Sequence, residues 1–389
     1  MDGPGGEIFA SDRVEIAVDR GKLWRGEVEL TRIILHQPRL TLTEDLDRGV
    51  GHFNLSLLRP PPSDGAPPRH LPRMAVQGGQ LRYATVKDGR FELRGSMGVD
   101  GQFQADSAQP TLFHLTLDET AEQPGENRVL VRGHIDLRTM QAQATVTGLR
   151  FVDRYFRLLP HQARAIWADA EPTGRLPQID LAYDRDQGPR ALIELTGLAI
   201  NVPQLAEADQ QFRMQDVTGL LRITERGITI EQDLVGAVVH RTLGERPTRV
   251  GPAQPDAPVL HYRVSGSMGL SPEDPFSLSL KTEDRFLVPE EPRYIFALPL
   301  AVQKFFHDFN ARGKIEATVA VIRQQHDQKP VFQGTATVYE GRGHFQKFPY
   351  DLTNVRGKIT FNERRIRILS LRGETSGGGS AIISGIIEP

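Results

Sequence analysis

Few residues of this sequence have the types and spacing that catalysis requires. The closest carboxylate pairs are Asp184 with Asp186 and Glu290 with Glu291. A glycan hydrolase would need two carboxylates that converge on one bond from separate elements. Both pairs lie in polar segments with no further candidate beside them, so solvated turns explain them. We predict no catalytic residue, and the chain is expected not to be an enzyme.

Metal and phosphate sites also lack their usual residues. The sequence has no cysteine, and its 11 histidines are scattered. His114, His134 and His261 fall at polar positions of alternating segments, where surface histidines are far commoner than ligands. The run Gly377–Gly379 is not followed by a lysine that would suit a phosphate loop, so a glycine kink is the better interpretation. No metal ion or cofactor is predicted.

Composition excludes one class of partner and favours one compartment. Lys and Arg number 47 against 49 Asp and Glu, and aromatic residues make up 7% of the chain. Nucleic-acid binding favours a basic surface and stacking aromatics, so no nucleic-acid partner is expected. The absence of cysteine fits an oxidising compartment, where a stray thiol would mispair.

Two segments of the sequence each predict a short helix with the same pattern of apolar residues. Pro160 and Pro299 each follow a leucine, and apolar residues recur 3, 6, 7 and 10 positions after each proline. This spacing places them on one helical face. Gly174 and Gly313 suit the end of each unit. We expect the two helices to lie across a sheet as plugs or end covers, with these residues in the contact: Leu159, Pro160, Ile166 and Trp167 in the first copy, and Pro299, Val302, Phe305, Phe306 and Phe309 in the second.

The similarity continues beyond the helices. Gly174 precedes Gly219 by 45 residues, and Gly313 precedes Gly357 by 44. Each helix is followed by several alternating apolar and polar segments, which are typical of strands. The chain thus repeats at an interval of about 139 residues, and repeated units commonly stack on one another.

Almost all of the remaining sequence alternates as strands do, with turn residues every 8 to 15 positions. The predicted fold is all-β with a few short helices: an elongated, curled antiparallel sheet built from repeats and open as a groove. The pattern begins and ends abruptly, so a longer protein is expected. Five segments are predicted: 1–58, an N-terminal hairpin block; 59–72, a proline-rich loop; 73–149, a sheet segment; 150–285, helix plus β repeat 1; and 286–389, helix plus β repeat 2.

Specific motifs carry a family resemblance. Gln37–Leu42 followed by Gly51–Leu55 resembles the N-terminal part of AsmA-like envelope proteins. The Leu-Leu-Pro helix, and Phe348–Phe361 followed by Gly377–Gly379, look like the repeated units of the YhdP and TamB type in that superfamily. The chain departs from the family in being short and in lacking an anchor helix.

This resemblance implies a function. An apolar groove in the sheet would carry phospholipid acyl chains through the periplasm between the inner and outer membranes and so maintain the outer membrane. The chain would be tethered to the inner membrane through an N-terminal segment that this sequence lacks. The alternating pattern supplies candidate lining residues on one face: Ile315, Ala317, Val319, Val321, Ile359, Phe361, Ile366 and Ile368.

Two alternatives share the same strand pattern. A closed sandwich would pack its apolar faces on each other and leave no groove. A structural or assembly scaffold of the envelope would bind partner proteins through the edges of the sheet. Alternation of residues is compatible with all three.

Overall fold

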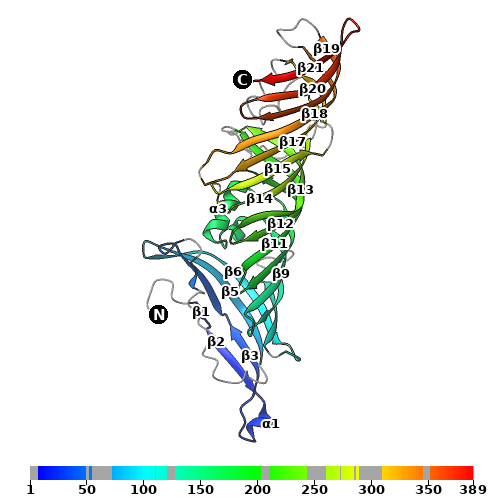
Figure 1. The fold of residues 1–389 in the computed structure, drawn as a ribbon. Helices are drawn as coiled ribbons and strands as arrows, with labels where there is room; N and C mark the ends of the chain where they lie inside the picture. Colours follow the sequence, from blue (N-terminus) through cyan, green and yellow to red (C-terminus); the bar gives the residue numbers. More distant parts are fainter. Residues whose placement is uncertain are drawn as a thin grey trace. The chain divides into compact units, whose positions relative to one another are not determined.

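The computed structural model describes residues 8–49, 52–54, 72–109, 111–120, 128–202, 210–242, 260–271, 273–283, 286–288, 309–326, 328–344 and 351–388. Strands make up 69% of the structure and helices 6%, which confirms the all-β class with few helices (Figure 1). The mixed sheet of these residues does not close into a barrel. Within the same ranges, no helix combines the length and apolar character that spanning a bilayer requires.

The chain divides into two compact units. Unit 1 comprises Met1–Ala168, Thr173–Glu194 and Arg222–Glu225. Unit 2 comprises Asp169–Pro172, Leu195–Leu221 and Arg226–Pro389.

Unit 1 begins with the predicted hairpin. Strands β2 and β3 pair antiparallel, and the segment between them forms the short helix α1, where the Asp19 side chain accepts a hydrogen bond from the Lys22 N–H. Strands β3 and β4 then pair in parallel with successive halves of β5, interrupted at Gln37 (φ 49°) and Pro38. The sheet is thus mixed here, whereas the alternating pattern predicted antiparallel pairing throughout. The bounds are β1 Phe9–Ala10, β2 Arg13–Val18, α1 Arg20–Leu23, β3 Leu30–His36, β4 Arg39–Asp45 and β5 Arg73–Lys87.

The rest of unit 1 is a run of consecutive antiparallel strands, of which the last, β11, belongs to this unit as far as Glu194. Each strand from β5 to β11 pairs with the next one in the chain. Helices α2 and α3 lie between β9 and β10 in sequence. The bounds are β6 Arg90–Ala105, β7 Leu112–Glu119, β8 Leu130–Asp136, β9 Gln141–Arg150, α2 Asp153–Phe156, α3 His161–Ala170, β10 Arg175–Asp184 and β11 Gly188–Asn201.

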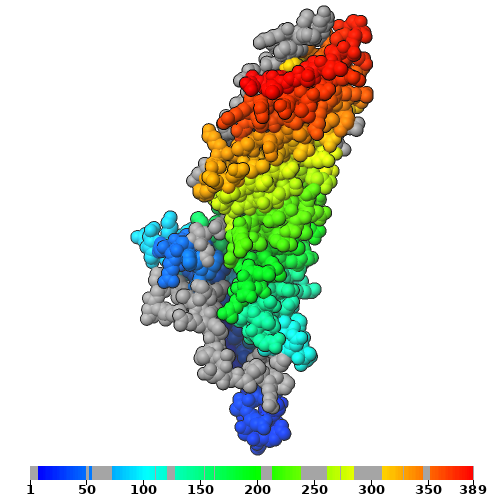
Figure 2. Space-filling model, viewed as in Figure 1, coloured from blue at the N-terminus to red at the C-terminus, as the bar shows by residue number. Residues whose placement is uncertain are grey.

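Unit 2 continues with the same kind of neighbour pairing. Strands β13, β14, β15, β17, β18, β19, β20 and β21 pair antiparallel in that order, and β16 also pairs with β17. In Figure 2 the yellow-to-red strands of this unit follow one another as adjacent bands. The bounds are β12 Gln210–Thr224, β13 Gly227–Thr242, β14 Leu260–Met268, β15 Phe276–Thr282, β16 Phe286–Val288, β17 Arg312–Arg323, β18 Val331–His344, β19 Asp351–Asn362, β20 Ile366–Thr375 and β21 Ser380–Ile387.

The sequence repeat has a counterpart in the backbone. Four positions of the first copy have positive φ angles, and the same four positions of the second copy have nearly the same angles. At Gly357 a side chain is impossible without rearrangement, since a Cβ atom would lie 1.9 Å from the Ser370 carbonyl oxygen. The matched pairs are Glu171 (39°) and Asn310 (39°), Gly174 (122°) and Gly313 (133°), Asp216 (52°) and Asn354 (51°), and Gly219 (149°) and Gly357 (151°).

Candidate apolar binding face

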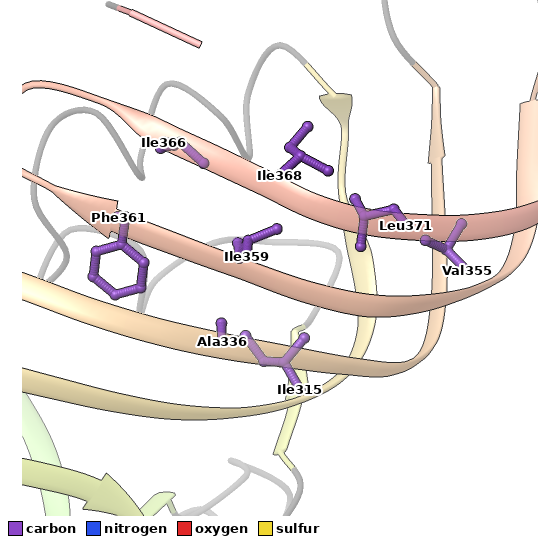
Figure 3. Packing of buried hydrophobic residues seen from close by; sticks show 8 residues of the cluster. All are labelled: Ile315, Ala336, Val355, Ile359, Phe361, Ile366, Ile368 and Leu371. Carbon is purple, nitrogen blue, oxygen red and sulfur yellow. The ribbon is translucent and has the colours of Figure 1, made fainter. Parts of the chain in front are cut away.

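The eight predicted groove residues share one face of unit 2. Their strands are in register, so that Ala336 on β18 lies opposite both Ala317 and Ile359, and Ile359 lies opposite Ile368. Six of the eight are buried, and Ala317 and Val319 are partly buried against the apolar cluster of this unit. The buried six are Ile315, Val321, Ile359, Phe361, Ile366 and Ile368, and all of these except Val321 form a cluster with Ala336, Val355 and Leu371 (Figure 3).

Phe361 shows how closely this cluster is packed. It lies opposite Gly334 on β18, and a Cβ atom added to Gly334 would be 2.3 Å from the tip of the Phe361 ring. The ring therefore occupies the space above the glycine that a side chain would otherwise fill. In unit 2 these residues therefore form a packed core. The more accessible apolar surface is on other strands.

A second apolar face crosses six strands of unit 1, from β6 to β11. Register pairs residues into three rows that run from strand to strand, and we call these rows the apolar ladders. The first is Gly101, Leu117, Val131, Val146, Ile179 and Ile193; the second is Phe103, Leu115, Gly133, Ala144, Leu181 and Ala191; the third is Ala105, Phe113, Ile135, Ala142, Tyr183 and Pro189.

The apolar ladders are more accessible than the unit 2 core. Among their large side chains, Phe113 is buried, whereas Leu181 is 41% and Tyr183 46% exposed. The others are partly exposed. The residues between them point to the opposite face because strand side chains alternate, and that face is largely polar. One row of it is Gln102, Thr116, Arg132, Thr145, Asp180 and Leu192.

The first predicted helix forms within unit 1 and packs on aromatic residues. The ring of Trp167 lies 4.7 Å from that of Phe151 and 6.0 Å from that of Phe156 between centroids. Trp167 and Ile166 on α3 are partly buried, as are Leu159 and Pro160 before it. Their predicted role as an end cover stays a prediction.

The second predicted helix lies almost wholly outside the described residues. This applies to Pro299, Val302, Phe305 and Phe306. Phe309 is described, and it packs partly buried against the apolar cluster of unit 2.

A buried carboxylate attaches α2 to the apolar side of the sheet. Glu119 lies two residues beyond Leu117 on β7, hence on the same face, and is 5% exposed. It accepts hydrogen bonds from the Val129 N–H (3.0 Å) and the Tyr155 hydroxyl (2.8 Å), and Arg154 lies 3.3 Å away. Burial, together with the bond to Glu119, raises the pKa of Tyr155 to about 12.

A second buried carboxylate attaches α3 in the same manner. Glu44 on β4 is fully buried and accepts hydrogen bonds from the Tyr83 hydroxyl and from the His161 N–H (2.9 Å) at the start of α3. The Arg164 guanidinium stacks 5.5 Å from the centre of the Tyr83 ring. Burial is the main reason that the pKa of Tyr83 is raised, and the bond to Glu44 adds to it. Two Glu–Tyr pairs thus anchor the helical segment to the strands.

Sequence reasoning missed both carboxylates. Glu44 precedes Asp45, and Glu119 follows Asp118, so each looked like the polar end of a strand. Only their three-dimensional partners distinguish them from solvated residues. The apolar ladders, in contrast, had a signal in the sequence, since β7, β8 and β9 alternate visibly.

The described residues that were considered for chemistry do not gather into one site. Asp184 accepts backbone N–H bonds from Asp186 and Gln187, which lower its pKa as in a solvated turn. His114 pairs with Asp106 at 3.1 Å, and its ring centre lies 6.4 Å from that of His134, with the two rings tilted by 60°. Within the described ranges, no three His, Asp or Glu side chains are grouped as metal ligands would be. Glu290 and Glu291 lie outside these ranges.

Compared with models of protein families, with curated proteins and with solved structures, the chain gave no match. The AsmA-like resemblance therefore rests on the sequence motifs alone. The geometry of the apolar ladders is the basis for the function proposed below.

Proposed function

We propose that this chain binds the acyl tails of phospholipids along the apolar ladders of β6 to β11. The observation that carries the proposal is the accessibility of these rows, in which Leu181 is 41% exposed. The largest apolar patch on a monomeric protein is often a functional site.

The ladders have the right dimensions for a hydrocarbon tail. Six strands at about 4.8 Å span roughly 24 Å, and three rows along each strand cover roughly 14 Å. One leaflet of a bilayer has a hydrocarbon depth of about 15 Å. The long dimension of the face therefore exceeds the length of an ordered tail, and its projected area of roughly 330 Å² is that of a functional patch.

Shielding a tail on this surface is favourable. Each methylene removed from water contributes about 0.8 kcal/mol, so ten shielded methylenes contribute roughly 8 kcal/mol before the loss of motional freedom. The polar opposite face, with Thr116 and Arg132, stays compatible with water. A sheet with one apolar face and one polar face suits the transport of a lipid through an aqueous compartment.

The cellular setting of the proposal comes from the AsmA-like resemblance. We infer a non-enzymatic envelope protein in the periplasm that moves phospholipid between the inner and outer membranes. A scaffold that binds partners through sheet edges is the second candidate, because the described sheet does not close into a barrel and therefore has edges.

Replacing Leu115 with aspartate is expected to abolish lipid binding. Leu115 lies in the central row between Phe103 and Gly133, so a charge there would have to be desolvated beneath a bound tail. Binding of a phospholipid with a fluorescent acyl chain measures the effect, and we expect an affinity loss of at least about 100-fold.

The matched control is Thr116→Asp on the same strand. Thr116 is exposed on the opposite face, so this variant should bind lipid as the unchanged protein does. Circular dichroism checks that both variants fold. If both variants bind phospholipid with the same affinity, or both lose affinity to the same extent, the lipid does not bind on the apolar ladders.

A further inference from the structure

The segment between β2 and β3 carries an exposed tryptophan. Helix α1 lies in this segment, at the end of the β2–β3 hairpin and away from the other labelled strands of unit 1 (Figure 1). We call residues 19–29 the hairpin tip. Trp24, which follows α1, is 90% exposed, and Leu23 and Val28 are 48% and 73% exposed. Three large apolar side chains of the hairpin tip thus face water.

Other turns of unit 1 have a different composition. The turn from β5 to β6 is Asp88–Gly89, and the turn from β10 to β11 is 185–187, which reads Arg-Asp-Gln. Turn geometry favours glycine, proline and short polar residues, and it does not require a tryptophan. The apolar residues of the hairpin tip are therefore not explained by the turn.

The backbone of the hairpin tip is hydrogen-bonded within the tip. The Trp24 N–H donates to the Arg20 carbonyl oxygen (3.1 Å), and the Gly26 N–H donates to the Leu23 carbonyl oxygen (3.0 Å). Gly26 has a φ angle of 78°, which a glycine adopts without strain. An N–H group that leaves water without a partner costs free energy. These bonds remove that cost for Trp24 and Gly26 if the hairpin tip enters a lipid environment.

Basic residues flank the apolar pair Leu23 and Trp24. Arg20 precedes the pair and Arg25 follows it, and both arginines are exposed. Tryptophan is enriched at the boundary between membrane and water, where its ring lies at the level of the headgroups. Arginine donates several hydrogen bonds to phosphate groups. The sequence Leu-Trp between two arginines is thus suited to a phospholipid headgroup region.

The acidic residues of the hairpin tip leave this charge largely uncompensated. Asp19 accepts a hydrogen bond from the Lys22 N–H (3.0 Å), and Glu29 pairs with the Lys22 ammonium group. Glu27 is the remaining acid of the segment. The two arginines outnumber it, so the outer part of the hairpin tip is positive. This charge is complementary to the negative surface of a membrane that contains anionic lipids.

We propose that the hairpin tip docks on the surface of a membrane that contains anionic phospholipid. Trp24 and Leu23 insert at the level of the headgroups, and Arg20 and Arg25 bind lipid phosphates. Affinity for such a surface grows with the apolar area that is buried and with attraction to anionic lipids. The inference goes beyond the binding of single tails by the apolar ladders, because it rests on the residues of the hairpin tip alone.

Vesicles of phosphatidylglycerol and phosphatidylethanolamine test this proposal. In the full chain with Trp167→Phe, Trp24 is the one remaining tryptophan. Its emission should shift to the blue when vesicles are added, and phospholipid brominated in the acyl chains should quench it. Unchanged emission without quenching overturns the proposal and assigns the hairpin tip to a protein partner.

Sedimentation with the same vesicles measures docking without a fluorescent reporter. Trp24→Ala should weaken the association at least about tenfold, because the indole ring no longer inserts. Phe91→Ala removes an aromatic side chain that is 47% exposed beside another turn, and it should sediment as the unchanged protein does. Circular dichroism checks that both variants fold. Equal association of the two variants contradicts docking through the hairpin tip.

Two further variants separate the contributions of charge and of the apolar ladders. Arg20→Gln combined with Arg25→Gln should weaken association with the anionic vesicles about tenfold and leave the weaker association with phosphatidylcholine vesicles unchanged. Leu115→Asp, which is expected to abolish tail binding on the ladders, should still sediment with the anionic vesicles. If Leu115→Asp fails to sediment and Trp24→Ala sediments normally, the ladders hold the vesicle and the docking proposal is wrong.

Discussion

Replacing Phe361 with alanine is expected to lower the free energy of unfolding by about 3–5 kcal/mol. Phe361 is 5% exposed in the core cluster of unit 2, and its ring also covers Gly334. Truncation therefore leaves a cavity over two strands, because the glycine has no side chain to fill it. Urea denaturation followed by far-UV circular dichroism, which reports on the strands, measures the change.

Two further variants test the cause of this loss. Phe91 is 47% exposed, so Phe91→Ala should change stability by less than about 1 kcal/mol. Gly334→Ala should destabilise the unchanged protein, since its methyl group meets the Phe361 ring and lies 2.8 Å from the Thr318 carbonyl oxygen. It should be tolerated better in the Phe361→Ala background, where the methyl group enters the cavity. If the double variant loses the sum of the unfolding free energies lost by the two single variants, the ring does not pack over the glycine.

Replacing Glu119 with alanine should lower the stability of unit 1 by about 2–5 kcal/mol. The substitution leaves two donors without their acceptor, the Tyr155 hydroxyl and the Val129 N–H, and each unpaired buried donor costs about 1–3 kcal/mol. The fluorescence of Trp167 during urea denaturation reports this loss of stability. Its ring packs against Phe151 and Phe156, which precede and follow Tyr155 in the sequence. The other tryptophan, Trp24, is 90% exposed and contributes little change.

An exposed glutamate provides the control. Glu92 pairs with Arg94 at 2.6 Å, and its side chain is 59% exposed. Surface pairs of this kind contribute little, so Glu92→Ala should stay within about 0.5 kcal/mol of the unchanged protein. Glu119→Gln keeps one acceptor oxygen and should lie between the two alanine variants. If Glu119→Ala unfolds at the same urea concentration as Glu92→Ala, Glu119 does not anchor the helical segment.

Alternation in the sequence determined which residues share a face. Ile359, Phe361, Ile366 and Ile368 were assigned to one face from their spacing, and they do lie together. Spacing does not determine whether that face is covered. In unit 2 the assigned residues are buried, whereas the equally alternating Leu181 of unit 1 is exposed. Exposure depends on the curvature of the sheet and on the segments beside it, which are long-range properties.

The polar anchors and the parallel pairing of β5 were also beyond local reasoning. Glu44 bonds to the backbone of His161, far away in the sequence, so no local pattern marks it. Parallel pairing depends on how the chain returns to the sheet between β4 and β5. Glycines, in contrast, were informative locally: Gly174 and Gly313 mark equivalent positive φ angles in both copies.

The most direct test of the central claim is photo-crosslinking of bound phospholipid from single positions. A photoreactive amino acid at Leu181, which lies in the central apolar ladder, should capture the acyl chain of a phospholipid supplied in vesicles. The same amino acid at Arg132, which is exposed on the polar face, should capture none. Crosslinking from Arg132 but not from Leu181, or equal crosslinking from both, would contradict lipid binding on the apolar ladders.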